Sequence, residues 1–407
     1  MSTAASSLAT PTTAPLTVKY NYAIGYLRAF IVALVVAHHA ALAYHPYAPP
    51  PPASLLTDPR WWPAFPIVDP QKWFGASVLV GFNDIFFMSL MFFLSGLFVW
   101  HGLAKKGAAT FLRDRLLRLG IPFIVAAGVF APLAYYPTYL QITGHNNIAG
   151  FWHQWSALGN WPAGPAWFIW VLFVFDCIAA LLFVFAPKWG DNLGAFTTRL
   201  ALRPIVFFAA LVAITAVVYL PMAHYFTSLA WFFSFGPFFV QTSRIFHYFV
   251  YFLAGVGVGA AGLDQGLLAP QGKLARAWPW WIGRALLFFA IATSLTIAAF
   301  TYYGKSPALA TAADAGFVLS CAATCLAFLA IFLRFAQTRS TICDSLAQNS
   351  YAIYLIHYAI VSWLQYALLP AAIPGVAKFL IVFPGALILS WATSAMIRRI
   401  PGVARII

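Results

Sequence analysis

Apolar runs of about 18 residues or more recur from one end of this chain to the other. A run of that length can cross a bilayer as a helix, and inside the bilayer only helices and closed barrels satisfy their own backbone hydrogen bonds. Charged residues make up 8% of the 407 residues, whereas they make up about a quarter of a soluble domain. The sequence therefore predicts an all-α fold, a polytopic membrane helix bundle.

Ten apolar segments predict about ten transmembrane helices. They are 23–44, 77–100, 119–139, 166–187, 204–222, 245–263, 282–303, 315–335, 350–369 and 377–397. An even number of spans places both termini on one side. That side carries all but five of the 23 basic residues (the five are Arg60, Lys72, Arg244, Lys305 and Lys378). Because basic residues gather in cytoplasmic loops, both termini are expected in the cytoplasm.

Three regions follow along the chain. Residues 1–20 are rich in Ala, Ser, Thr and Pro and are expected to be a disordered cytoplasmic tail. The membrane domain is expected over 21–400 and a cytoplasmic tail over 401–407. Within the domain, the apolar stretch 229–243 is short and interrupted by Gly236-Pro237. It is expected to be an interfacial or re-entrant piece and not an eleventh span.

The net charge of +14 raises the question of a nucleic-acid partner. The basic residues are spread between apolar runs and do not form one basic domain, so the positive-inside bias explains them and no nucleic acid is expected. The four cysteines lie in or beside apolar runs, which suits packing and not a disulfide framework. No metal is expected, since metal motifs such as HExxH and paired CxxC do not occur.

Arg28 and His39 lie on the first apolar segment, where ionisable side chains are costly and mark a pathway or site. Eleven residues at about 100° each bring the two side chains to one helix face, about 16 Å apart along the axis. His39 is a candidate general base, and a hydrogen bond to a neighbouring helix is the alternative. His38 points about 100° away from it.

Other polar residues lie in or near the predicted spans. Asp84 and Asp176 are carboxylates that could orient a histidine ring, although the sequence pairs neither with His39. Arg115 and Arg118 are three residues apart at the cytoplasmic start of the third segment. Neighbouring arginines of this kind can bind phosphates, and ordinary positive-inside anchoring would also produce them.

Two further segments carry small or polar residues. Ser95-Gly96 in the second segment suits either a site or close helix packing. Tyr354 and His357 lie on nearly one face of the ninth segment, so a second intramembrane histidine is expected to point into the bundle. Trp and Tyr in the outer loops, 45–76 and 140–165, fit an aromatic belt at the membrane interface or sugar stacking.

Four motifs occur in order on the first, second, third and ninth segments. They are R-x10-H (Arg28, His39), FF-x-SG (Phe92, Phe93, Ser95, Gly96), RxxR-x3-P (Arg115, Arg118, Pro122) and SY-x-IYL-x-H (Ser350, Tyr351, Tyr354, Leu355, His357). Together they resemble the acyltransferase-3 family of integral membrane acyltransferases, over about residues 22–397. The membrane domain without an appended esterase-like domain is similar to the glucan biosynthesis protein C branch.

The resemblance implies an O-acyltransferase of the bacterial inner membrane. It would move an acyl group, acetyl or in some branches succinyl, from cytoplasmic acyl-CoA to a hydroxyl of a glycan or lipid-linked sugar. His39 would act as the base or as a transient acyl carrier, and Arg28 would stabilise negative charge on the donor phosphate or the oxyanion. Arg115 and Arg118 would hold the CoA phosphates. Acetyl-CoA is the expected donor, and membrane lipids surround the protein.

Three residues would line the cavity and fix the thioester, namely Ser95, Tyr354 and His357.

The alternative to an enzyme is a transporter or exporter of an acyl group or small solute, because intramembrane Arg, His and Asp also mark transport paths. A purely structural scaffold does not account for several buried ionisable residues.

Overall fold

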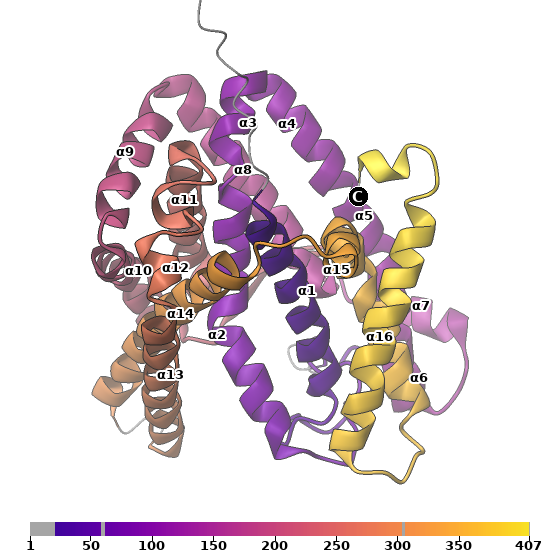
Figure 1. Ribbon diagram of the computed structural model, residues 1–407. Coiled ribbons are helices and arrows are strands. Elements are labelled where there is room, and N and C mark those ends of the chain that lie inside the picture. Colours follow the sequence, from indigo (N-terminus) through magenta and orange to yellow (C-terminus); the bar gives the residue numbers. More distant parts are fainter. Residues whose placement is uncertain (1–20, 58–61, 303–305, 407) are drawn as a thin grey trace, which may run out of the picture.

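The computed structural model of the chain describes residues 21–57, 62–302 and 306–406 (Figure 1). The long helices are α1 (Tyr22–Leu42), α2 (Phe74–Gly96), α8 (Trp167–Phe185), α10 (Pro204–Phe226), α11 (Ile245–Ala261), α13 (Trp278–Thr301), α14 (Pro307–Phe335), α15 (Thr341–Ala367) and α16 (Gly375–Ile397). A further continuous helical stretch comprises α4 (Ala108–Arg115), η1 (Leu116–Gly120), α5 (Ile121–Val125), η2 (Ala126–Phe130) and α6 (Ala131–Thr143).

Shorter elements connect these helices. They are α3 (Val99–Lys106), α7 (Ile148–Ala157), η3 (Gly164–Ala166), α9 (Trp189–Ala201), β1 (Trp231–Phe235), β2 (Phe238–Gln241), η4 (Thr242–Arg244), η5 (Gly266–Leu268), α12 (Lys273–Arg276) and η6 (Val403–Arg405). The predicted tail 1–20 lies outside the described residues, as do Arg60 and Lys305. The predicted tail 401–407 contains the single turn η6.

Nine helical segments among the described residues are long and apolar enough to cross a membrane. The remaining predicted span, 350–369, corresponds to α15, which is 27 residues long but is not among those nine. Its polar residues, including Asn349, His357 and Gln365, make it less apolar than the others. The two described ends of the chain lie on the same side of the bundle (Figure 1). That requires an even number of crossings, so α15 supplies the tenth, and the predicted all-α polytopic bundle is confirmed.

The stretch 229–243 forms an antiparallel hairpin and not a transmembrane helix. Strands β1 and β2 pair from Trp231 with Gln241 to Phe235 with Phe238. Gly236 in the connecting turn has φ +51°, a left-handed conformation that glycine adopts without strain. Its carbonyl accepts a hydrogen bond from the backbone of Trp161 (3.2 Å), which docks the hairpin on the loop before α8.

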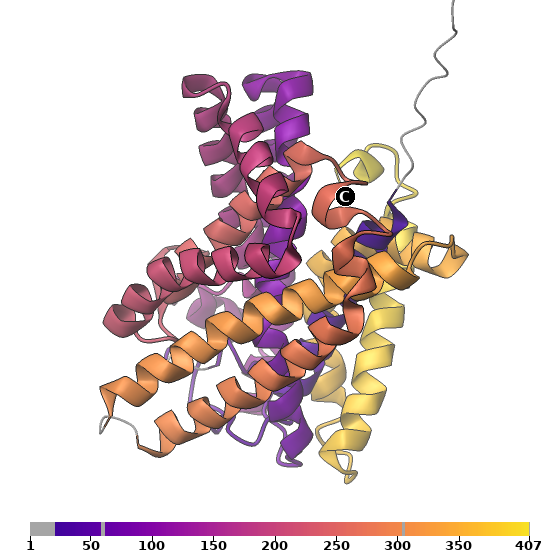
Figure 2. The ribbon, with the colours of Figure 1, turned by 60° about the vertical axis from the view of Figure 1, so that its left-hand side comes forward.

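Helix α2 lies at the centre of the packing. Its Phe92 ring contacts Phe168 and Phe175 of α8 and Tyr248 of α11, with ring centroids 4.6, 5.2 and 5.1 Å apart. Figure 2 shows the long hairpin of α13 and α14 leaning away from α16.

Glycines allow α2 and α11 to cross at close range. A Cβ at Gly255 would overlap the carbonyl oxygen of Phe93, and one at Gly259 would overlap that of Leu97. On the other helix, a Cβ at Gly96 would overlap the carbonyl oxygen of Phe252. Small residues at such positions let helix backbones approach each other in a membrane. The packing role considered for Gly96 is thus confirmed.

Replacing Gly255 by Ala should destabilise the bundle by about 1–3 kcal/mol, because the new methyl group meets backbone that cannot rotate away. Gly81→Ala on α2 is the matched control, since nothing lies within 4 Å of its Cβ position. The midpoint of thermal unfolding in detergent should fall for Gly255→Ala and hold or rise for Gly81→Ala. Equal midpoints for the two variants would contradict the close crossing.

A buried ion pair fastens the first outer loop to the last helix. Lys378 Nζ lies 2.6 Å from Asp69 Oδ2, and both side chains are almost fully buried. The same ammonium donates to the carbonyl of Leu369 (3.3 Å), and the backbone of Asp69 donates to Ala43 at the end of α1 (3.0 Å). The loop is therefore tied to both α1 and α16.

Lys378→Met should lower stability by about 3–5 kcal/mol, because it leaves the Asp69 carboxylate buried without its partner. The double variant Lys378→Met/Asp69→Leu removes both charges and should recover most of that loss. Thermal unfolding of the three proteins in detergent measures the difference. A double variant no more stable than Lys378→Met would show that the loop does not depend on pairing of these charges.

Candidate active site

Helices α1 and α15 bring the two predicted intramembrane histidines together. His39 Nδ1 lies 3.3 Å from His357 Nε2, and the two ring centroids are 5.1 Å apart. His39 Nδ1 also lies 2.8 Å from the carbonyl oxygen of Val35, one turn earlier on α1. His357 Nδ1 lies 2.7 Å from the carbonyl oxygen of Tyr354, one turn earlier on α15.

These contacts assign the protons on the two rings. A carbonyl oxygen only accepts, so Nδ1 of each ring carries a proton and donates it. His357 Nε2 is then a lone-pair acceptor facing His39 Nδ1–H. His39 Nε2 also holds a lone pair, and it has no hydrogen-bond partner among the described residues. The half-buried His39 ring thus has one nitrogen fixed and the other open, as a general base requires.

Neighbouring side chains fix the position of the pair. The Tyr358 ring meets His39 edge to face, with centroids 4.9 Å apart. Gln365 Nε2 donates to the carbonyl oxygens of His39 (2.9 Å) and Ala40 (3.1 Å), at the point where α1 approaches its end. On the other side His38 stacks on Phe87 of α2, with centroids 5.1 Å apart. His39 is therefore held from α15 and His38 from α2.

An outer loop covers the histidines. The carbonyl of Pro63 accepts hydrogen bonds from Tyr358 (3.1 Å) and from Tyr135 of α6 (2.9 Å). Trp62 is buried and packs edge to face on Tyr135, with centroids 5.1 Å apart, and Trp155 of α7 packs on the same two rings. These outer-loop tryptophans are packed against the protein, which leaves their faces unable to stack on a sugar. They cover the histidine pair on the side of Tyr358.

A small pocket lies beside Tyr358. It has room for about one water molecule (about 10 Å³). Its lining is mostly small or apolar, namely Ala126, Phe130, Ala131, Ala163, Pro165, Ala166, Tyr354, Leu355 and Tyr358. The Tyr354 hydroxyl donates to the carbonyl of Pro165 at its edge. Tyr354 lies in the wall of this pocket, and its predicted contact with the thioester stays a prediction.

Arginines surround the first half of α15. Arg28 Nη2 of α1 donates to the carbonyl of Ala347 (3.3 Å), and Arg398 after α16 donates to that of Gln348. One turn further, Tyr351 donates to the carbonyl of Arg118 (2.6 Å), whose own side chain is exposed. Three segments far apart in the sequence therefore bring the guanidinium groups of Arg28 and Arg398 and the backbone of Arg118 to the first half of α15.

Arg115 does not project freely beside Arg118. Its Nε lies 3.1 Å from Oδ2 of the fully buried Asp176 of α8, close enough for an ion pair but not aligned as a hydrogen bond. Neither of the two carboxylates that the sequence offered has a hydrogen bond or ion pair with His39 in the described part of the chain, since Asp176 pairs with Arg115 and Asp84 pairs with Arg244. The side chain that contacts Nδ1 of His39 is therefore His357 and not a carboxylate.

Ser95 is half-buried on α2, and its hydroxyl has no hydrogen bond to the described residues. The structure does not bring it to the two histidines through any contact. Its neighbour Gly96 explains the motif by packing against α11. The predicted role of Ser95 in the cavity stays a prediction.

Two π-helical turns interrupt the helix that carries Arg115 and Arg118. Turn η1 includes Arg118, and turn η2 includes Ala126 of the pocket wall. A π turn leaves backbone carbonyls without a partner in the regular ladder and is frequent at functional sites. Tyr351 donates to a carbonyl in η1, and Trp161 Nε1 donates to that of Ala127 in η2 (3.3 Å). Both interruptions are thus stabilised by side chains around the site.

Sequence reasoning missed Tyr358, Gln365 and the carbonyl of Pro63 as parts of the site. Tyr358 and Gln365 were visible signals, since they are polar residues on the same helix as His357. Pro63 had no such signal, because its contribution is a backbone atom placed by the fold. Within the part of the chain that the structure describes, no three His, Cys, Asp or Glu residues are placed to hold a metal ion.

Comparison with known families gives one match, to the acyltransferase domain model of family 3, over residues 21–395. No curated protein and no solved structure matches the chain in the corresponding comparisons. The family match covers nearly the whole chain and includes every helix that forms the histidine site. The chain therefore belongs to the acyltransferase-3 family and is an O-acyltransferase that spans the membrane many times.

Proposed function

We propose that this enzyme moves an acyl group from cytoplasmic acyl-CoA to a hydroxyl of a glycan or lipid-linked sugar in the bacterial inner membrane, with His39 as the base. The observation that carries the proposal is the open Nε2 of His39, opposite a Nδ1–H that Val35 and His357 hold in place. Since the family is one of acyltransferases, the exporter that the sequence left open is set aside.

The reaction needs one proton transfer in each direction. His39 Nε2 takes the proton of the acceptor hydroxyl as its oxygen attacks the thioester carbonyl. The carbon–sulfur bond then breaks, the ester forms, and the same nitrogen returns the proton to the CoA thiolate. While His39 is an imidazolium, the lone pair of His357 Nε2 accepts its Nδ1–H (3.3 Å) and stabilises the charge. No other oxidant, metal or co-reactant is required.

The donor would enter from the end of the bundle that carries the arginines. Arg28, Arg118 and Arg398 lie around residues 347–351 of α15. Guanidinium groups bind phosphates through paired hydrogen bonds. Arg28 is about 16 Å along α1 from His39, which fits a contact with donor phosphates better than one with the oxyanion. The flexible arm of CoA can cover such a distance.

The pocket beside Tyr358 supports a short acyl group. Four alanines line a space of about 10 Å³, room for about one water molecule, and Tyr358 of its lining also contacts His39. Acetyl-CoA is therefore the donor that we propose, and succinyl-CoA is the alternative. The acceptor class, including a glucan, comes from the resemblance to the glucan biosynthesis protein C branch and is part of the proposal.

His39→Ala should lower acyl transfer about 10²- to 10⁴-fold, the usual contribution of a general base. His153→Ala is the control, since His153 is exposed on α7. Both variants should keep the wild-type unfolding midpoint. The assay follows acyl-CoA consumption by the purified protein, together with mass spectrometry of surface and periplasmic glycans from cells carrying each variant.

The two readouts have distinct meanings. A mass difference of one acyl unit, lost in both the deletion strain and the His39→Ala strain, would identify the acyl group and the acceptor fraction. Substantial turnover by a folded His39→Ala protein would refute the base. Unchanged glycans together with no consumption of acyl-CoA would refute the proposed reaction itself.

Arg118→Gln should raise the KM for acyl-CoA about 10- to 100-fold and leave kcat unchanged, because one hydrogen bond to a charged group is lost. The backbone carbonyl that Tyr351 uses is retained in this variant. Arg113→Gln is the control on the same helix, since its side chain is 73% exposed and lies toward Asp114. An equal effect of both substitutions would indicate general membrane anchoring by these arginines.

A further inference from the structure

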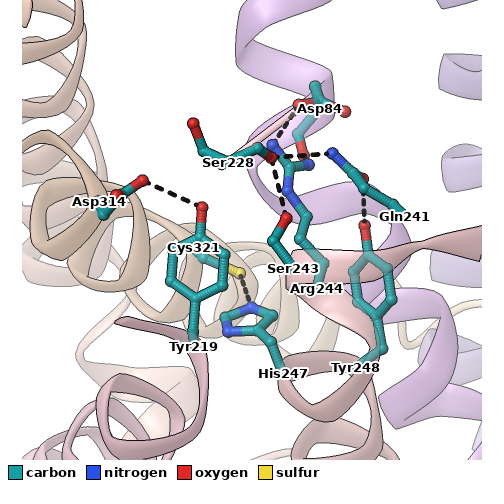
Figure 3. Close-up of polar contacts among 10 residues, drawn as sticks. All are labelled: Asp84, Tyr219, Ser228, Gln241, Ser243, Arg244, His247, Tyr248, Asp314 and Cys321. Carbon is teal, nitrogen blue, oxygen red and sulfur yellow. Dashed lines mark hydrogen bonds and ion pairs between the residues drawn. The ribbon is translucent and has the colours of Figure 1, made fainter. Parts of the chain in front are cut away.

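A second group of polar side chains lies in the bundle and takes no part in the mechanism above (Figure 3). It joins α2, α10, β2, η4, α11 and α14 through side chains of Asp84, Tyr219, Gln241, Ser243, Arg244, His247, Tyr248, Asp314 and Cys321. Its contacts include Tyr219 to Asp314 (3.3 Å), Cys321 to His247 (3.5 Å) and Tyr248 to Gln241 (3.3 Å). At the edge of this group lies the ion pair of Asp84 and Arg244.

Arg244 holds Asp84 at two points. Its Nη2 lies 2.8 Å from Asp84 Oδ2, and its Nη1 donates to the backbone carbonyl of the same residue (3.0 Å). The second carboxylate oxygen, Oδ1, has no hydrogen bond to the described residues. One side of the carboxylate is therefore fixed, and the other is left to bind something else.

The two partners differ in exposure. The Arg244 side chain is 5% exposed, and the Asp84 side chain is 41% exposed. Arg244 packs its guanidinium over the Phe317 ring at 4.4 Å, and its Nε is buried without a partner. Just before it, the Ser243 hydroxyl donates to the carbonyl of Ser228 (3.1 Å). Arg244 is thus buried and held in place, whereas the Asp84 carboxylate that it binds is half-exposed.

The position of Asp84 within α2 indicates what its open side contacts. Asp84 lies eleven residues into α2, and a carboxylate exposed to lipid at such a place is expensive. Its open side is therefore expected to face a water-filled recess. Asp84 also precedes Phe87 by about one turn, so both lie on one face of α2. That face meets α1, where Phe87 stacks on His38 next to His39.

The arginines and Asp84 lie at different levels along α1. The arginines lie toward the end of α1 that carries Arg28. Asn83, next to Asp84 on α2, donates to the carbonyl of Leu34 (3.3 Å), so Asp84 lies beside the second half of α1 and away from Arg28. A carboxylate repels CoA phosphates, but it accepts hydrogen bonds from hydroxyl groups. The chemistry of the Asp84 carboxylate therefore suits the acceptor and not the donor.

We infer that Asp84, held by Arg244, is a binding residue for a polyhydroxylated acceptor. Its Oδ1 accepts a hydrogen bond from a hydroxyl near the one that is acylated, and it forms no covalent bond. The inference rests on the proposed function and adds to it a residue that binds the acceptor. It also assigns a role to Arg244 as a positioning residue.

The test is steady-state kinetics of the full-length protein in detergent, with acetyl-CoA as donor and glucose oligosaccharides as acceptor. Asp84→Asn keeps the shape of the side chain and should raise the KM for the oligosaccharide about 10- to 100-fold, the loss of one hydrogen bond to a charged group. The KM for acetyl-CoA and the slow hydrolysis of acetyl-CoA without acceptor should stay within about twofold. Asp264→Asn, in an exposed loop, is the control.

The outcomes separate this inference from the proposed function. If the wild type acylates the oligosaccharides and Asp84→Asn leaves their KM unchanged, or changes the KM of both substrates equally, the inference is overturned. If the wild type acylates none of them, the glycan acceptor and this inference fall together. Should Asp84→Asn not fold, Asp84→Glu keeps the charge beside Arg244 but moves the free oxygen, and the same selective rise in KM is expected.

Discussion

The lipid bilayer offers no hydrogen-bond partners, so the polar side chains inside this bundle must find partners in the protein. The consequence is visible at each functional feature. His39 is held by Val35 and His357, Asp176 by Arg115, and Asp84 by Arg244. In each case the partner comes from a distant part of the sequence or from the preceding helical turn. The positions of the active groups thus follow from the need to pair them.

Helix α15 contacts arginines at one end of the bundle and His39 further along its length. Its first turns receive Arg28 and Arg398 through the carbonyls of Ala347 and Gln348, and its Tyr351 binds the carbonyl of Arg118. Further along, His357 and Gln365 hold His39. These polar residues are the reason that α15 is less apolar than the other spans. It can cross the membrane because the surrounding helices bury it and satisfy its polar groups.

The π-helical turns and the close crossing of α2 and α11 are local features that depend on contacts with other parts of the chain. Carbonyls that η1 and η2 release are taken up by Tyr351 and Trp161. Glycines 255 and 259 let α11 lie against the backbone of α2, which places Arg244 at the start of α11 beside Asp84. The second polar group and the histidine site therefore share α2 as a common wall.

The sequence alone determined the bundle, because runs of apolar residues can be read without knowing their neighbours, and it identified His39, His357 and Tyr354 as residues of interest. Their roles in the reaction remain predictions. Which residues meet was decided by the tertiary structure. Spacing within one helix brings Arg28 and His39 to one face, but it carries no information on the helix that lies opposite. For that reason the contact of His39 with His357, the pairing of Arg115 with Asp176 and the backbone carbonyl of Pro63 over the site could be found only in the folded chain.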